Sequence, residues 1–265
     1  MVFFIVVVGF IVVVVYYRNQ LEVAYEEVGR MTAPIRSTIL PFPNHYKEIL
    51  QKYFGYYNRL NTQQQHAFEQ KLLYFIMSKK FIPRQFRPVT DEMKVMIGAC
   101  AVQLTFGLPR VYLQHFDKIL IYPTDYYSSI SKRFHKGEVN PAFGAIVLSW
   151  KSFVDGYIYT NDSVNLGLHE MAHALRLENI IHNDEYNFFD DALVEQFDTY
   201  ARQLCSLPSS EDTFLRAYAC ANPHEFFAVA VENFFERPAE FKNALPEVYA
   251  ILAKLLNQDP ILHFS

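Results

Sequence analysis

Two histidines four residues apart, His169 and His173, constrain this chain more than any other feature, because they occur in the motif His-Glu-x-x-His. In an α-helix, residues i and i+4 lie about 40° apart on one face, so both imidazoles can reach a single metal ion. Ala172 and Ala174 keep such a helix slim enough to pack closely in a core. The motif therefore predicts a buried helix that carries a zinc site.

Glu170 is the expected general base of this motif. It lies about 100° around the helix from His169, which is poor for a metal ligand but suitable for contact with a water on the metal. The alternative is that both histidines are buried and satisfied by ordinary hydrogen bonds. A catalytic zinc site needs three protein ligands, so a third ligand elsewhere in the chain would favour the metal.

His182 is one candidate for the third ligand, nine residues after His173. The metzincin pattern would also need Gly at position 176 and His at position 179, where this chain has Arg176 and Asn179. The chain therefore does not match the metzincin pattern, and His182 is not expected to bind the metal.

A second candidate region is residues 221–238, which form a predicted amphipathic helix with Asn222 as its cap and Pro223 at its first position. Glu225 and Glu232 lie seven residues apart on one face of this helix. A carboxylate on an otherwise apolar face needs a partner, and a metal ion is one such partner. The spacing alone leaves both glutamates open as ligands.

Four segments of the chain carry a family resemblance. They are NLGLHEMAHALRL (165–177), AYACANPHEFFAVAVENFFERP (217–238), IVLSW (146–150) and LNQDP (256–260). Together they resemble the MtfA family of zinc peptidases, relatives of the lethal-factor-like zincins, and the likeness covers roughly residues 37–260. Family members commonly read HExxHxLD, whereas this chain has Arg176 at the position of the Asp.

The resemblance implies a gluzincin-type site in a zinc-dependent peptidase that acts on peptides or proteins. In that reading Zn²⁺ is bound by His169, His173 and Glu225, and Glu170 is the base. Tyr218, seven residues before Glu225, falls where such enzymes carry a tyrosine that hydrogen-bonds the oxyanion. The resemblance also implies an alternative, a regulatory protein that binds and sequesters a transcriptional regulator.

Geometry supports Glu225 over Glu232 as the third ligand. Pro223 fixes the start of the helix, so Glu225 lies in its first turn, and Glu232 would lie about 10 Å further along the axis. Glu232 then has two interpretations, a salt-bridged carboxylate or a hydrogen-bond partner of a metal-bound histidine. By the same helical geometry, His224 is expected to face solvent.

The first seventeen residues, Met1 to Tyr17, contain no charged side chain. As a helix they would reach roughly 25 Å, just enough to span a membrane with help from the terminal tyrosines. The alternatives are a cleaved signal peptide and a buried strand. The segment lacks the basic start and the cleavage site of a signal peptide. Arg18, Arg30 and Arg36 follow it, which predicts a single-pass inner-membrane anchor with the remainder in the cytoplasm.

The remaining pattern predicts an α+β fold, mostly helical and zincin-like with a small β-sheet, over residues 37–265, joined to the anchor by a linker over 18–36. The expected helices before the sheet are one capped by Asn44 up to about Tyr57, one opened by a capping box Thr62-x-x-Gln65, and one begun by Thr90. Strands are expected at 118–122 and 145–150. Helices are expected again after Asn161, the first of them capped by Asp162 or Ser163. Trp150 closes the second strand, either as a core residue or on an edge strand that pairs with substrate.

Charge and cysteine content limit the partners and the compartment. The chain has 24 Lys and Arg against 28 Asp and Glu, a net charge of −4, so a nucleic-acid partner is not expected. The three cysteines, Cys100, Cys205 and Cys220, are odd in number and contain no CxxC. They are therefore expected to be reduced, inert thiols, in agreement with a cytoplasmic domain.

Overall fold

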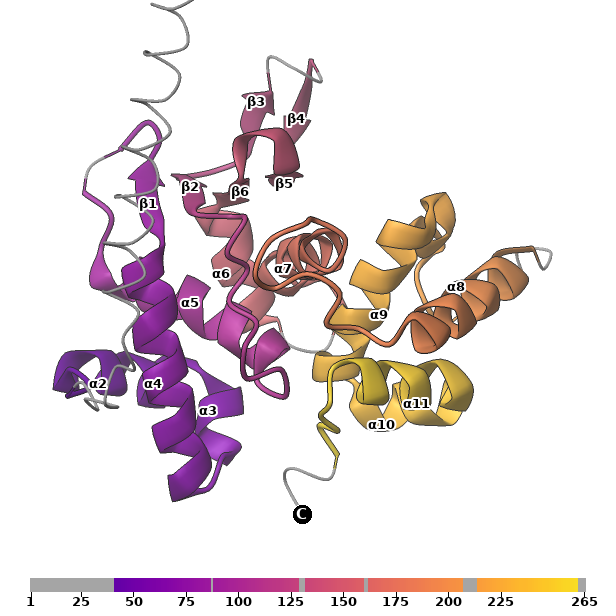
Figure 1. Ribbon diagram of the computed structural model, residues 1–265. Coiled ribbons are helices and arrows are strands. Elements are labelled where there is room, and N and C mark those ends of the chain that lie inside the picture. The colour runs from indigo at the N-terminus through magenta and orange to yellow at the C-terminus, as the bar shows by residue number, and fades with distance from the viewer. Residues whose placement is uncertain (1–40, 87, 129–131, 160–161, 207–213, 262–265) are drawn as a thin grey trace, which may run out of the picture. The chain divides into compact units, whose positions relative to one another are not determined.

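The computed structural model describes residues 41–86, 88–128, 132–159, 162–206 and 214–261. Within this part of the chain the predicted α+β class is confirmed, with many helices and a small sheet (Figure 1). The predicted anchor (1–17) and linker (18–36) lie outside the described residues. Among the helices that the structure describes, none is both long and apolar enough to cross a membrane.

The elements follow one another as helices, a sheet region and helices again. The first group is α2 (Asn44–Tyr53), α3 (Gly55–Arg59), α4 (Thr62–Ser78), β1 (Lys80–Pro83) and α5 (Asp91–Thr105). The sheet region is β2 (Lys118–Tyr122), β3 (Tyr126–Ser128), β4 (Arg133–His135), β5 (Gly137–Asn140), the 3₁₀ turn η1 (Pro141–Phe143) and β6 (Ala145–Ser149). The last group is α6 (Trp150–Ile158), α7 (Leu166–Glu178), α8 (Asp191–Ser206), the 3₁₀ segment η2 (Ala217–Ala221), α9 (Pro223–Glu236), α10 (Pro238–Ala244) and α11 (Pro246–Leu255).

Two of the predicted helix caps are confirmed. The Thr90 side chain accepts a hydrogen bond from the Met93 N–H at the start of α5. The Asn222 side chain accepts from the N–H groups of His224 and Glu225 at the start of α9.

Three other predicted caps are wrong. Helix α2 has Pro43 at its cap position and includes Asn44, and α3 is a separate helix. The capping box of α4 is formed by Asn61 and Gln64, one residue earlier than predicted.

The third cap error concerns α7, which carries the two histidines. The Asp162 carboxylate accepts from the Val164 N–H in a local turn, and Ser163 has a positive φ of 59°. Neither residue is therefore next to the helix, and Asn165 caps it by accepting from the Leu168 N–H.

The main sheet has the strand order β1-β2-β6-β5. Strands β1, β2 and β6 are parallel, while β5 runs antiparallel to β6 and forms one edge. The predicted strand at 118–122 is confirmed, and the one predicted at 145–150 is confirmed over 145–149. The strands β1 and β5 and the β3–β4 hairpin were not predicted, because they are short and irregular in pattern.

Trp150 does not belong to a strand. The Ser149 side chain accepts a hydrogen bond from the Ser152 N–H, so α6 begins at Trp150. The indole stacks on Phe153, with ring centroids 5.4 Å apart, and packs against the core. Strand β6 is paired on both sides, so the prediction that it could be a substrate-pairing edge strand is wrong.

The prediction of reduced, inert cysteines is wrong for two of the three. Cys205 at the end of α8 and Cys220 in η2 form a disulfide, with Cα atoms 5.4 Å apart. Their separation of 15 residues gave no motif, and only the fold brings them together. Cys100 is a buried free thiol whose pKa burial raises to about 12.

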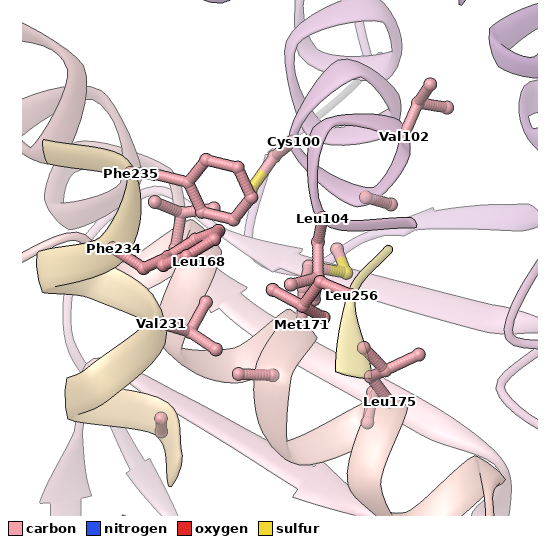
Figure 2. Close-up of a cluster of buried hydrophobic side chains, with 14 of the residues drawn as sticks. Cys100, Val102, Leu104, Leu168, Met171, Leu175, Val231, Phe234, Phe235 and Leu256 are labelled. Atoms are coloured by element: carbon pink, nitrogen blue, oxygen red, sulfur yellow. The ribbon is translucent and has the colours of Figure 1, made fainter. Parts of the chain in front are cut away.

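Helix α7 lies at the centre of the domain (Figure 1). Its apolar face, with Leu168, Met171 and Leu175, contacts buried side chains of α5 and α9 (Figure 2). Close packing at its first turn depends on Gly167, where an added Cβ would lie 2.6 Å from the Phe153 ring and 3.0 Å from Cys100 Sγ. Side chains on the opposite face of α7 are thereby held in fixed positions.

Gly167→Ala is expected to destabilise the domain by about 1–3 kcal/mol through overpacking, although alanine favours helix by roughly 1 kcal/mol over glycine. Gly55→Ala is the matched control, because a Cβ on Gly55 meets nothing within 4 Å. Urea denaturation of both variants measures the difference. A Gly167→Ala chain as stable as Gly55→Ala would contradict this packing.

Candidate metal centre

Three predicted ligands converge between α7 and α9. The Nε2 atoms of His169 and His173 lie 3.0 Å apart. Glu225 Oε2, from the first turn of α9, lies 3.1 Å from His169 Nε2 and 3.4 Å from His173 Nε2. Among the described residues, these three form the group of His, Cys, Asp and Glu side chains arranged to hold a metal ion.

The spacing of the three atoms fits a zinc ion. Ligand atoms each about 2.0–2.1 Å from a tetrahedral zinc lie about 3.3 Å apart. Glu225 Oε2 is buried and has no hydrogen bond of good geometry among the described residues, although two imidazole nitrogens face it. A buried carboxylate oxygen of this kind is explained by a cation shared with the two nitrogens.

The second nitrogen of His169 has its own carboxylate. His169 Nδ1 lies 2.6 Å from Glu232 Oε1, two turns along α9 from Glu225. Glu232 is fully buried, and a carboxylate can only accept hydrogen bonds. The ring proton of His169 therefore lies on Nδ1, which donates to Glu232. The lone pair of Nε2 is thereby directed at the candidate metal position.

Glu232 also binds Arg216, so it is a salt-bridged carboxylate as well as the hydrogen-bond partner of His169. The Arg216 guanidinium donates to both carboxylate oxygens, at 2.6 and 3.1 Å, and to the Ser163 carbonyl at 2.7 Å. The Asn165 N–H donates to the same carboxylate at 2.8 Å. Arg216 was not predicted, because nothing in its local sequence marks it.

Glu170 is buried beside the cluster, against strand β5. An added Cβ on Gly137 would lie 2.5 Å from Glu170 Oε1, so only glycine allows the edge strand to pass this close. Burial, with the nearby negative charges of Glu225 and Glu232, raises the pKa of Glu170 to about 8, against the lowering effect of His169. Gly137 is a second residue that the sequence did not reveal.

The pKa values of His169 and Glu225 are shifted in opposite directions. Burial opposes the charge on His169, but the adjacent carboxylates of Glu225 and Glu232 outweigh it and raise the His169 pKa to about 9. Burial would raise the Glu225 pKa, but the two imidazoles outweigh it and hold the pKa well below its usual range.

Tyr218 lies next to the cluster, on η2. Its ring centroid is 6.1 Å from that of His169, and the side chain is 52% exposed. Burial of the hydroxyl, together with Glu225, raises its pKa to about 12, so the phenol keeps its proton at neutral pH. Tyr218 can therefore donate a hydrogen bond into the cleft.

The other residues considered from the sequence do not belong to the group of three ligands. His182 is exposed and stacks on Tyr186, with centroids 4.2 Å apart. His224 is exposed on α9, as expected. Arg176 pairs with Asp198 of α8, at 2.6 Å, and so links the two helices instead of facing the cluster.

Three features lie together here and can hold a metal ion: a His-Glu-x-x-His helix, a glutamate from a later helix, and an antiparallel edge strand beside the glutamate of the motif. The family described as glucose-regulated metallo-peptidase M90 matches residues 32–256. The chain belongs to this family. The resemblance to MtfA peptidases is thereby confirmed.

The chain is also similar in sequence to curated proteins of other bacteria. An uncharacterized protein of Synechocystis is 26% identical over 242 residues, which cover 84% of this chain and 87% of the relative. Mlc titration factor A of Yersinia pestis is 26% identical over 220 residues, which cover 76% of this chain and 80% of the relative. The same protein from Yersinia pseudotuberculosis matches to the same extent.

Arg216→Ala is expected to lower the free energy of unfolding by roughly 2–3 kcal/mol, because it leaves the buried Glu232 carboxylate without its cation. Arg202→Ala is the control, since its pair with Glu195 is exposed and should contribute little. Chemical denaturation of both variants measures the effect. Equal stabilities would show that Arg216 does not hold Glu232.

Proposed function

We propose that this chain is a zinc-dependent peptidase in which His169, His173 and Glu225 hold the metal. The convergence of their three ligand atoms at 3.0–3.4 Å carries this proposal. Membership of a metallopeptidase family supports it. The substrates are peptides or proteins.

When bound, zinc supplies Lewis acidity, which acidifies a water ligand and polarises the scissile carbonyl. Glu170 has the position of the general base: it takes the proton of the attacking water and delivers it to the leaving amine. The Glu170 carboxyl would be in its ionised, proton-accepting form with a cation held by the neighbouring ligands. The Tyr218 hydroxyl, which stays protonated, donates to the oxyanion.

A second candidate function is the binding and sequestration of a transcriptional regulator. The name Mlc titration factor A, which the Yersinia relatives carry, favours it. A binding protein would not need a buried carboxylate with a raised pKa beside the metal ligands, so Glu170 favours the peptidase.

Glu170→Gln separates the two functions. This variant should keep one zinc per chain and its fold while peptide hydrolysis falls by at least about 10²-fold, because only the base is lost. Metal analysis and turnover of a peptide library by the full chain measure both properties. Hydrolysis at the wild-type rate would contradict the role of Glu170, and absence of hydrolysis in the wild type would favour the regulatory function.

We also propose that residues 1–17 anchor the chain in the inner membrane, with the catalytic domain on the cytoplasmic side. The uncharged run and the following Arg18, Arg30 and Arg36 support this orientation. The Cys205–Cys220 disulfide argues against it, because disulfides persist mainly in oxidising compartments.

A reporter fused after Ser265 tests the orientation. Activity of a cytoplasmic reporter, together with release of the chain from the membrane fraction on deletion of residues 1–17, is the expected result. A trimmed chain on the periplasmic side would mean that the segment is a signal peptide.

A further inference from the structure

Two hollows meet at the candidate metal centre and share His169, Glu170 and Tyr218. The first, of about 490 Å³, continues past Lys136 of the β4–β5 connection and the end of α6 to Leu166 of α7. The second, of about 400 Å³, continues along β5 and past His173. A peptide whose reacting bond lies beside Glu170 would thus have room for residues on both sides of that bond.

Four exposed apolar or aromatic side chains lie among the residues that line the first hollow. The exposed fraction of these side chains is 75% for Phe134, 62% for Tyr159, 49% for Val164 and 52% for Tyr218. They come from four separate segments of the chain, and Tyr127 packs edge-on against Phe134 at 5.5 Å. Soluble proteins rarely gather exposed aromatic side chains in this way unless the surface binds something.

The second hollow has a different character. Its lining includes the ionisable side chains of Glu138, His173, His224 and Glu225, and its aliphatic members Val139 and Leu177 are partly covered by other atoms. The charged groups that line the first hollow have mixed signs, and two of them pair with each other; they are Lys136, Asp155, Asp162, Glu170 and the paired Arg216 and Glu232. The two sides of the centre therefore differ in exposed apolar surface, because Phe134, Tyr159 and Val164 line only the first hollow.

We propose that the first hollow binds a large apolar or aromatic side chain of the peptide substrate, on one side of the scissile bond. Burial of such a side chain against Phe134 and Tyr159 removes apolar surface of both partners from water. A volume of 490 Å³ lies within the range of small-ligand sites and holds an aromatic side chain with its backbone. The inference rests on the proposed peptidase function and names the substrate class of that site.

The test uses the full, zinc-loaded chain and sets of peptides that differ at one residue, Phe, Leu, Ala or Asp, placed in turn on either side of the cleaved bond. On one side, kcat/KM for Phe or Leu should exceed that for Ala by about tenfold or more. Phe134→Ser should reduce this ratio several-fold. Phe143→Ser should leave it unchanged, because Phe143 is 65% exposed but lines neither hollow.

A binding measurement keeps this inference separate from the proposed function. Zinc-loaded Glu170→Gln should bind the Phe peptide about tenfold more tightly than the Ala peptide, as measured by calorimetry. If the wild type cleaves nothing but this difference in Kd is present, the peptidase function fails and the apolar site stands. Equal Kd values, binding of neither peptide, or a preference for Asp would overturn the inference even if peptides are cleaved.

Discussion

The hydrogen bond from His169 Nδ1 to Glu232 is the interaction on which the centre depends. It fixes the imidazole so that its other nitrogen faces His173 and Glu225. Glu232 has no exposed surface, so its charge must be matched inside the protein, and Arg216 and the Asn165 N–H provide this. One buried carboxylate on α9 thereby joins the first turn of α7 to the segment that carries Tyr218.

Close packing on two sides makes this arrangement rigid. Gly167 lets α7 press against α6 and α5 on the core side, and Gly137 lets the edge strand β5 pass directly beside Glu170 on the open side. The disulfide between Cys205 and Cys220 attaches the segment of Tyr218 to α8. The ligand atoms are therefore held near a zinc geometry by the fold itself, as preorganised sites require.

Local sequence patterns predicted the parts of the site but not what connects them. The spacing of His169 and His173, and the Asn222-Pro223 start of α9, depend on helix geometry alone and could be read directly. Arg216, Gly137 and the disulfide act across long sequence distances and carry no local pattern. Strand β5 is four residues long with mixed polarity, so no alternation marked it. Trp150 was misplaced because the cap at Ser149 turns an apolar run from strand to helix within one residue.

Zinc titration of the full chain tests the central claim most directly. Wild type should bind one zinc ion tightly, and Glu225→Ala should lose at least about 10²-fold in affinity, because a catalytic zinc site needs three protein ligands. His182→Ala should bind zinc as the wild type does, since this histidine stacks on Tyr186 and lies outside the cluster. Tight, stoichiometric zinc in Glu225→Ala, or its loss in His182→Ala, would contradict the assignment of the metal centre.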